Sequence, residues 1–233
     1  SLCGIAKGSG MIAPAMATTL AFVFTDARLP TPVLRTLLKE GIRTSFTCIT
    51  VGSDTSTSDT VLLAATGRAL NGLPQSATAP ELKAFRAALR ELLTDLAIQV
   101  VRDGEGASKF ITVDVGGAAS NAEARKAALA IANSPLVKTA IAGEDANWGR
   151  IIMAVGKSGA RLFQKHLAIS IGGITITHAG ERVGSYDERE VTKHLRGAEI
   201  SIAVNLGVGR SKSRVWTCDL THDYIRINAD YRT

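Results

Sequence analysis

One threonine, Thr18, stands where residue type and spacing suit nucleophilic chemistry. It follows Ala17 at the end of a segment with glycines at positions 4, 8 and 10 and one lysine, Lys7, and it precedes an apolar run. A threonine hydroxyl is a weak nucleophile at neutral pH unless a base lies beside it. At a chain N-terminus the residue's own α-amine is such a base, with an ordinary pKa of about 7.7–8.0.

The pattern around Thr18 has two interpretations. In one, the chain cuts itself between Ala17 and Thr18. Small neighbours then leave the hydroxyl room to reach the preceding carbonyl, and the glycines permit the unusual backbone of a strained loop. In the other, a glycine-rich loop enters a buried strand and Thr18 is an ordinary strand residue. The local pattern alone favours the second interpretation.

Four motifs, in order along the chain, favour the first interpretation instead. One begins as GIAKGSGMIAP and continues through MAT and LAFVFTDA, in residues 4–27. The others are DTSTSDT at 54–60, GEDANWGR at 143–150 and YIRINADYRT at 224–233. Together they resemble the ornithine acetyltransferases, also called glutamate N-acetyltransferases of arginine biosynthesis, nearly from end to end.

The resemblance implies a ping-pong acetyl transfer from N-acetylornithine to glutamate. After self-cleavage at Ala17–Thr18, the acetyl group is held as an ester on Thr18. Matching positions, among them a glutamate in the stretch RDGEG at 102–106, also imply a set of substrate-binding residues: Lys7, Thr18, Glu105, Asn228 and Thr233. No cofactor is implied. Some family members also accept acetyl-CoA as donor, and the sequence leaves that activity open.

The resemblance also implies how the chain is divided. Residues 1–17 match the C-terminal end of an α chain. Residues 18–135 match a first β-chain lobe with the nucleophile, and residues 136–233 a C-terminal lobe with a substrate-binding tail. The implied fold is α/β, with layered sheets flanked by helices, of the DmpA/ArgJ-like N-terminal-nucleophile type. The implied partner is an upstream α chain whose Thr-Gly pair forms the oxyanion hole, in an α2β2 heterotetramer. We therefore expect this chain to be inactive alone.

Two other functions remain open from the sequence. A self-processing aminopeptidase or amidase of similar fold would release its product to water and would not need glutamate. A structural or binding subunit would leave Ala17–Thr18 uncut and would tolerate loss of Thr18. Ala15 and Thr19 stand where the family pattern has asparagine and methionine, which bears on the rate of cleavage more than on its chemistry.

Composition argues against several classes of protein. The net charge of +6 comes from 27 basic and 21 acidic residues that are scattered along the chain, so we expect no nucleic-acid partner. No run of about eighteen apolar residues predicts a membrane span, and no signal peptide is apparent. Three widely spaced cysteines indicate free thiols in a reducing compartment, which predicts a cytoplasmic protein. The four dispersed histidines predict no metal site.

Periodicity and capping signals predict the elements that must position these residues. A buried strand is expected at 19–26. We expect helices at 31–45, from a Thr78–Glu81 capping box to 103, from Ser120 to 133, and from a Ser185–Glu188 cap. Further strands are expected at 46–51, 109–115, 167–171, 174–178, 200–205 and 213–220. Segments 61–66, 136–142 and 151–155 are compatible with strand or helix. The 54–60 loop either lines the site or is a solvated turn, and Trp148 is more typical of core than of a site.

Overall fold

The computed structural model describes residues 1–8, 19–54 and 59–230. The chain forms two compact units, Ser1–Asp103 and Gly104–Thr233. The expected lobe boundary at 135/136 lies within the second of these units. Residues 104–135 belong with the second unit because their strand and helix pack against its sheet. The expected division at 17/18 lies outside the described residues. None of the described helices is long and apolar enough to cross a membrane.

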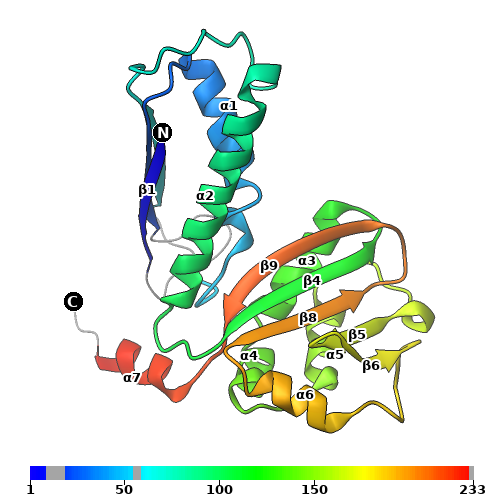
Figure 1. The fold of residues 1–233 in the computed structure, drawn as a ribbon. Helices are drawn as coiled ribbons and strands as arrows, with labels where there is room; N and C mark the ends of the chain where they lie inside the picture. The colour runs from blue at the N-terminus through cyan, green and yellow to red at the C-terminus, as the bar shows by residue number, and fades with distance from the viewer. Residues whose placement is uncertain (9–18, 55–58, 231–233) are drawn as a thin grey trace. The chain divides into compact units, whose positions relative to one another are not determined.

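The first unit contains a three-stranded sheet in the order β1-β2-β3. Strand β1 of this sheet is labelled in Figure 1. Its strands are β1 (Leu2–Lys7), β2 (Leu20–Thr25) and β3 (Thr60–Ala65). β1 runs antiparallel to β2, and β2 runs parallel to β3. A parallel pair needs a crossover connection, and helix α1 (Thr31–Ile42) lies within it. Sheet order and this pairing were not readable from the sequence.

Helices α1 and α2 (Lys83–Arg102) pack together, and α2 packs on the sheet. The inward side chains of the sheet include Ala21, Val23 and Leu63, all buried. Glycine permits two close approaches. A Cβ on Gly41 would lie 2.4 Å from a Leu93 methyl carbon, and a Cβ on Gly4 would lie 2.8 Å from one of Leu96. The small residues of β1 and α1 therefore allow α2 to pack closely against both.

The second unit contains a six-stranded sheet in the order β7-β6-β5-β8-β4-β9. The strands are β4 (Phe110–Ala118), β5 (Ala168–Ile171), β6 (Ile174–His178), β7 (Glu181–Arg182), β8 (Glu199–Asn205) and β9 (Ser211–Cys218). β4 and β8 are parallel, and the other neighbours are antiparallel.

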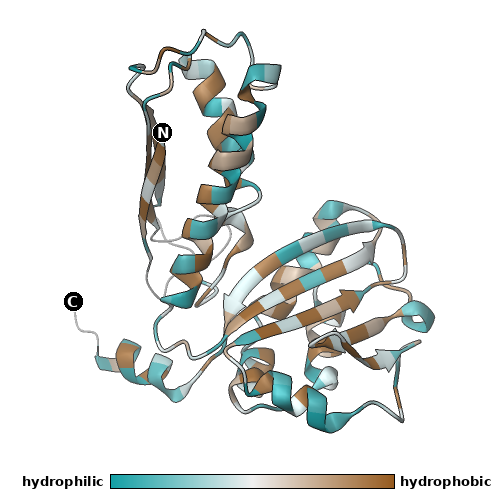
Figure 2. Ribbon diagram, viewed as in Figure 1, coloured by the Kyte–Doolittle hydropathy of each residue, from teal (hydrophilic) through white to brown (hydrophobic). Residues whose placement is uncertain are grey.

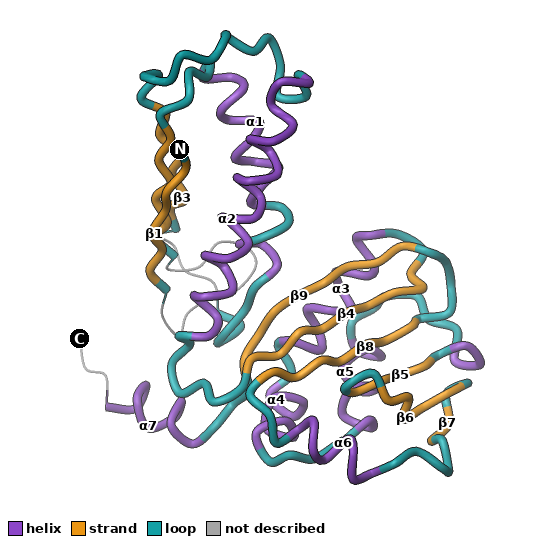
Figure 3. The backbone as a smooth tube through the Cα atoms, in the orientation of Figure 1, coloured by secondary structure: helices purple, strands orange, loops and turns teal. Residues whose placement is uncertain are grey.

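Helices cover one face of this sheet. They are α3 (Asn121–Ala132), α4 (Pro135–Ala142) and α5 (Trp148–Lys157), with α6 (Glu188–Leu195) completing the core (Figure 3). Hydrophobic and polar residues alternate along β4 and β8 (Figure 2), so Ile111, Val113 and Ile202 face the helices. The last helix, α7 (His222–Asp230), has no buried residue.

The expected α/β fold with sheets flanked by helices is confirmed, with several local corrections. β1 was not predicted. The strand predicted at 46–51 is instead a 3-10 helix, Phe46–Cys48. Helix α2 lacks the expected capping box, since the Thr78 hydroxyl pairs with Ser76 and a 3-10 turn, Pro80–Leu82, precedes the helix. Helix α6 is capped by Asp187 and not by Ser185. The ambiguous segments are strand β3 and helices α4 and α5.

Candidate active site

Two hydrogen bonds hold Thr19, the residue before β2, to Asp59 and to Thr60, the first residue of β3. Thr19 is buried, and its backbone N–H donates to Asp59 Oδ1 over 2.8 Å. Its carbonyl accepts from the Thr60 backbone N–H over 2.9 Å. Ala17 and Thr18 lie outside the described residues. However, Thr19 directly follows Thr18 in the chain, so Asp59 holds the backbone nitrogen of the residue after the predicted nucleophile.

Asp59 also carries an unsatisfied atom. Its Oδ2 is buried and has no hydrogen-bond partner in the structure as described. A buried carboxylate oxygen without a donor is costly, and native proteins rarely retain one without a reason. The sequence singled out the 54–60 loop but gave no role to any one residue in it. The pairing of β2 with β3 provides the missing signal, because it brings Asp59 to Thr19, the residue before β2.

Lys7 is the last residue of β1 and is exposed. In the β1–β2 register it stands opposite Leu20, the first residue of β2. The structure therefore brings the predicted carboxylate-binding lysine to the end of the sheet at which β2 begins. These residues all belong to the first unit.

Glu105 and Asn228 belong to the second unit, and the structure joins them. Asn228 Nδ2 donates to Glu105 Oε2 over 3.1 Å, across a separation of 123 residues in sequence. The same Nδ2 donates to the Tyr224 carbonyl within α7, which fixes the direction of the amide. Glu105 is half-buried and Asn228 is exposed. Thr233, the remaining predicted binding residue, lies outside the described part of the chain.

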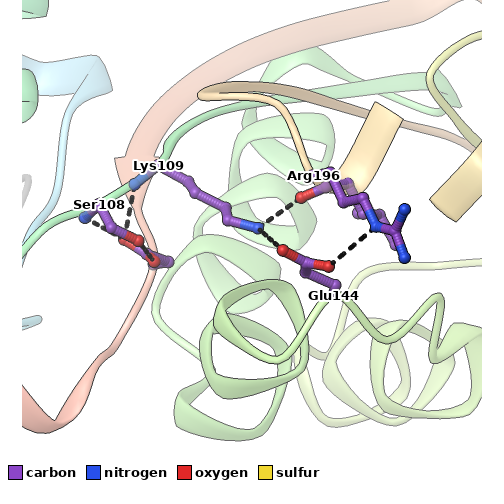
Figure 4. A network of polar contacts seen from close by, with 6 residues as sticks. Ser108, Lys109, Glu144 and Arg196 are labelled. Atoms are coloured by element: carbon purple, nitrogen blue, oxygen red, sulfur yellow. Dashed lines mark hydrogen bonds and ion pairs between the residues drawn. The ribbon is translucent and has the colours of Figure 1, made fainter. Parts of the chain in front are cut away.

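The loop that carries Glu105 is anchored to the segment that leads into α7. The Thr221 hydroxyl donates to the Gly106 carbonyl over 2.6 Å. Gly106 has φ +70, and a Cβ there would lie 2.3 Å from the Tyr224 backbone nitrogen. Buried Asp219 accepts three hydrogen bonds, from the Ser108 backbone and hydroxyl and from the Lys109 backbone (Figure 4). These contacts place Glu105 against α7.

A small buried polar cluster lies near Asp219. Lys138 and Cys218 are both buried, with Nζ and Sγ 4.0 Å apart. Burial lowers the pKa of the Lys138 ammonium, and the nearby Cys218 and Asp219 partly oppose this effect. Burial also raises the pKa of the Cys218 thiol, against the opposing effect of Lys138. The cluster lies close enough to Asp219 for its charge to act on both groups, and it contains none of the predicted site residues.

The GEDANWGR motif has a structural role in this fold. Asn147 Oδ1 caps α5 by accepting from the Arg150 backbone, and Arg150 Nη1 donates to the Leu136 carbonyl in α4. Trp148 packs against the core, as expected. Glu144 forms ion pairs with Lys109 and Arg196, each at 3.5 Å (Figure 4). A hollow of about 390 Å³ opens beside this motif, but none of the predicted site residues lines it.

Comparison with known proteins places the whole chain in one family. The model of the ArgJ family matches residues 1–233. "Arginine biosynthesis bifunctional protein ArgJ" of Gluconobacter oxydans is 57% identical over 230 residues, which is 99% of this chain and 54% of the relative. The Zymomonas mobilis protein of the same name is 54% identical over 232 residues, 100% of this chain and 57% of the relative. This chain thus spans little more than half the length of these relatives.

A solved structure supports the same placement. The crystal structure of "Arginine biosynthesis bifunctional protein argJ" from Bacillus halodurans matches with a TM-score of 0.85 and 44% identity. The match covers 90% of this chain and 98% of that chain. Sequence, family model and three-dimensional fold agree over nearly all residues, so the chain belongs to the ArgJ family.

Proposed function

We propose that this chain is the nucleophile-bearing part of a glutamate N-acetyltransferase that moves the acetyl group of N-acetylornithine to glutamate. The relatives carry the words "Arginine biosynthesis bifunctional protein" in their names, which supports a role in that pathway. The observation within the molecule that carries the proposal is the hydrogen bond between Glu105 and Asn228. The resemblance implies that both residues bind substrate, from stretches far apart in sequence, and the fold brings the two side chains into contact.

The active form arises by cleavage between Ala17 and Thr18. A contrast in coverage supports this step. The curated relatives are matched over 54–57% of their length, whereas the solved Bacillus halodurans chain is matched over 98% of its length. A separate chain close in length to residues 18–233 is what cleavage at this bond would produce.

In the first half-reaction the Thr18 hydroxyl oxygen attacks the acetyl carbonyl carbon of N-acetylornithine, and the Thr18 α-amine takes the hydroxyl proton. The carbon–nitrogen bond breaks, the departing nitrogen receives the proton, and ornithine leaves. In the second half-reaction the neutral α-amine of glutamate attacks the acetyl ester. The ester bond to Thr18 breaks, the hydroxyl regains a proton, and N-acetylglutamate departs. No cofactor enters either step.

Each binding residue has a role suited to its chemistry. The Glu105 carboxylate pairs with an amino group of the substrate and Lys7 with its α-carboxylate. Asn228 and Thr233 supply further polar contacts from the tail. The oxyanion donors come from a Thr-Gly pair on the α chain, and the working assembly is an α2β2 heterotetramer. The free thiols of Cys3, Cys48 and Cys218 suit the reducing cytoplasm as the site of the reaction.

Intact-mass measurement tests the central step. The protein is expressed from its complete gene, as wild type and as Thr18→Ala. Two fragments meeting at Ala17–Thr18 in the wild type, and one uncut mass in the variant, are expected. An uncut wild-type protein would remove the free α-amine and with it this mechanism.

A turnover assay separates the proposal from hydrolysis. Release of ornithine from N-acetylornithine must depend on glutamate and must yield N-acetylglutamate in equal amount. Release without glutamate would instead support the aminopeptidase or amidase alternative. Replacing N-acetylornithine with acetyl-CoA in the same assay measures whether the thioester also serves as donor.

A further inference from the structure

The hydroxyl group of Thr221 has hydrogen-bond partners on two different elements. It donates to the Gly106 carbonyl over 2.6 Å, since a carbonyl oxygen can only accept. The same oxygen accepts from the Asp223 backbone N–H over 3.2 Å. Thr221 directly precedes α7, so this second bond is the one that an N-cap side chain makes to the first turn of a helix. One hydroxyl therefore joins the Glu105 loop to the start of α7.

The two elements that Thr221 joins carry two predicted substrate-binding residues. Glu105 directly precedes Gly106, and Asn228 lies in the second turn of α7. Their side chains meet at 3.1 Å. Helix α7 has no buried residue among those described, so polar contacts rather than burial of its side chains hold it against the loop. A link at the first turn sets where Asn228 lies relative to Glu105.

The backbone of the Glu105 loop lies close to the first turn of α7. A Cβ on Gly106 would be 2.3 Å from the Tyr224 backbone nitrogen, so the two backbones approach to the limit that glycine permits. On its other side the loop is fixed by Asp219, whose carboxylate accepts from the Ser108 backbone and hydroxyl. Glu105 thus lies between two anchors, and both come from the segment that links β9 to α7.

We propose that Thr221 is a positioning residue for the substrate site, because its hydroxyl fixes α7 relative to the Glu105 loop and so aligns Asn228 with Glu105. Thr221 acts through these two side chains and not on the reacting atoms. The inference rests on the proposed function in taking both side chains as substrate-binding residues. An N-cap that only stabilised α7 would affect stability but not substrate affinity, so the two roles give different results.

Thr221→Val keeps the shape of the side chain and removes both hydrogen bonds. In the protein expressed from its complete gene, we expect KM for N-acetylornithine and for glutamate to rise about three- to tenfold, with kcat changing less, because binding groups lose alignment. Thr221→Ser retains the donor and the acceptor and should restore both KM values. Unchanged KM values in Thr221→Val would overturn the proposal.

Ser120→Ala is the matched control for the loss of a helix cap. Ser120 caps α3 by accepting from the Glu123 backbone N–H over 3.2 Å, the same length as the bond from Asp223 to Thr221. Helix α3 contains none of the predicted site residues. Ser120→Ala should lower Tm about as much as Thr221→Val while leaving KM unchanged. An equal rise in KM in both variants would show that lost stability alone is enough, and would refute the positioning role.

Hydrogen exchange, measured by mass spectrometry of peptides, tests the link without an activity assay. Thr221→Val should speed exchange both in residues 104–109 and in residues 222–230, whereas Ser120→Ala should speed it in neither. Faster exchange in residues 222–230 alone would mean that Thr221 only caps α7, against the proposal. If the wild type transfers no acetyl group but both segments respond, the proposed function falls and the link remains. Normal transfer with unchanged KM and exchange in Thr221→Val would remove the link and leave the function.

Discussion

At the residue scale, Asp59 holds the backbone next to the predicted nucleophile with one carboxylate oxygen. Hydrogen bonds to a charged acceptor are stronger than neutral ones, about 1.5–3 against 0.5–1.5 kcal/mol. Asp59→Asn retains the size and an oxygen acceptor for the Thr19 N–H but removes the charge. We expect kcat to fall about tenfold, which corresponds to about 1.4 kcal/mol, with KM changing less.

Steady-state kinetics and the rate of fragment formation by mass spectrometry measure this effect. Asp54→Asn is the matched control, because Asp54 is an exposed aspartate in the same loop. An Asp59→Asn enzyme with normal kcat and normal cleavage would show that the hydrogen bond to Thr19 serves folding alone.

Glu105 offers a second test at the same scale. Glu105→Gln keeps an oxygen that can accept from Asn228 and removes the charge expected to pair with the substrate's amino group. A lost charged hydrogen bond of about 1.5–3 kcal/mol predicts kcat/KM lower by roughly 10- to 100-fold. Glu91→Gln, an exposed change in α2, is the control. Unchanged kcat/KM would remove Glu105 from the binding site while leaving Thr18 in place.

At the element scale, the connection between the Glu105 loop and α7 depends on Gly106. An alanine there would need φ near +70 and would drive its Cβ into the Tyr224 backbone. Such strain costs about 1–3 kcal/mol, so Gly106→Ala should lower the free energy of unfolding by that amount and reduce acetyl transfer. Denaturant titration with a parallel activity assay measures both.

Gly156→Ala is the matched control for that change. Gly156 lies within α5, has no atom within 4 Å of an added Cβ and does not have the positive φ of Gly106. An alanine at a helix interior is favoured over glycine by about 0.5–1 kcal/mol, so a small gain in stability is expected. Equal losses in both variants would contradict the strain argued for Gly106.

The contact between α6 and β8 should make stability depend on pH. His194 Nε2 accepts from the Ser201 backbone N–H over 2.9 Å, so the structure holds the neutral imidazole. Burial lowers its pKa below the ordinary 6.5. Between the two pKa values the unfolded chain binds more protons than the folded protein, so the free energy of unfolding falls as pH drops below about 6.5.

Thermal unfolding measured from pH 7.5 to 5 in His194→Gln tests this sign. The variant should lose part of the decline seen in the wild type. His222→Gln, at an exposed position in α7, should leave the decline unchanged. A steeper decline in His194→Gln would mean that the folded state prefers the protonated ring.

Where the sequence carries a clear helix-capping signal that the structure retains, the predicted helix forms. Ser120 caps α3 through the Glu123 backbone, as its spacing indicated. The strand predicted at 46–51 does not form, because side-chain hydrogen bonds favour a turn there. Ser45 and Thr47 donate their hydroxyls to the last carbonyls of α1, which favours a tight turn over extension. β1 was missed because its inward positions include Gly4 and Ala6, so its alternation of apolar and polar residues is weak.

At the scale of the whole molecule, the sequence could select site residues but not explain how they meet. The motifs marked Glu105 and Asn228, yet their contact depends on the pairing of β4 with β9, which sets Phe110 opposite Cys218. No motif assigns a role to Asp59, and its position next to Thr19 becomes visible only from the parallel pairing of β2 with β3. Both pairings join segments distant in sequence, and period and capping signals contain no information about such partners.

The last prediction concerns the chain by itself. No oxyanion-hole pair is assigned within residues 1–17, and the resemblance implies that the donors lie on the α chain; one such donor is worth about 2.7–4 kcal/mol of barrier, a factor of about 10²–10³. Residues 1–233 expressed alone should therefore show no measurable acetyl transfer, and addition of the remaining part of the protein should restore it. Circular dichroism with a cooperative thermal transition must first show that the isolated chain is folded. A transfer rate comparable to that of the complete protein would mean that residues 1–233 already hold every group the reaction needs, including the oxyanion donors.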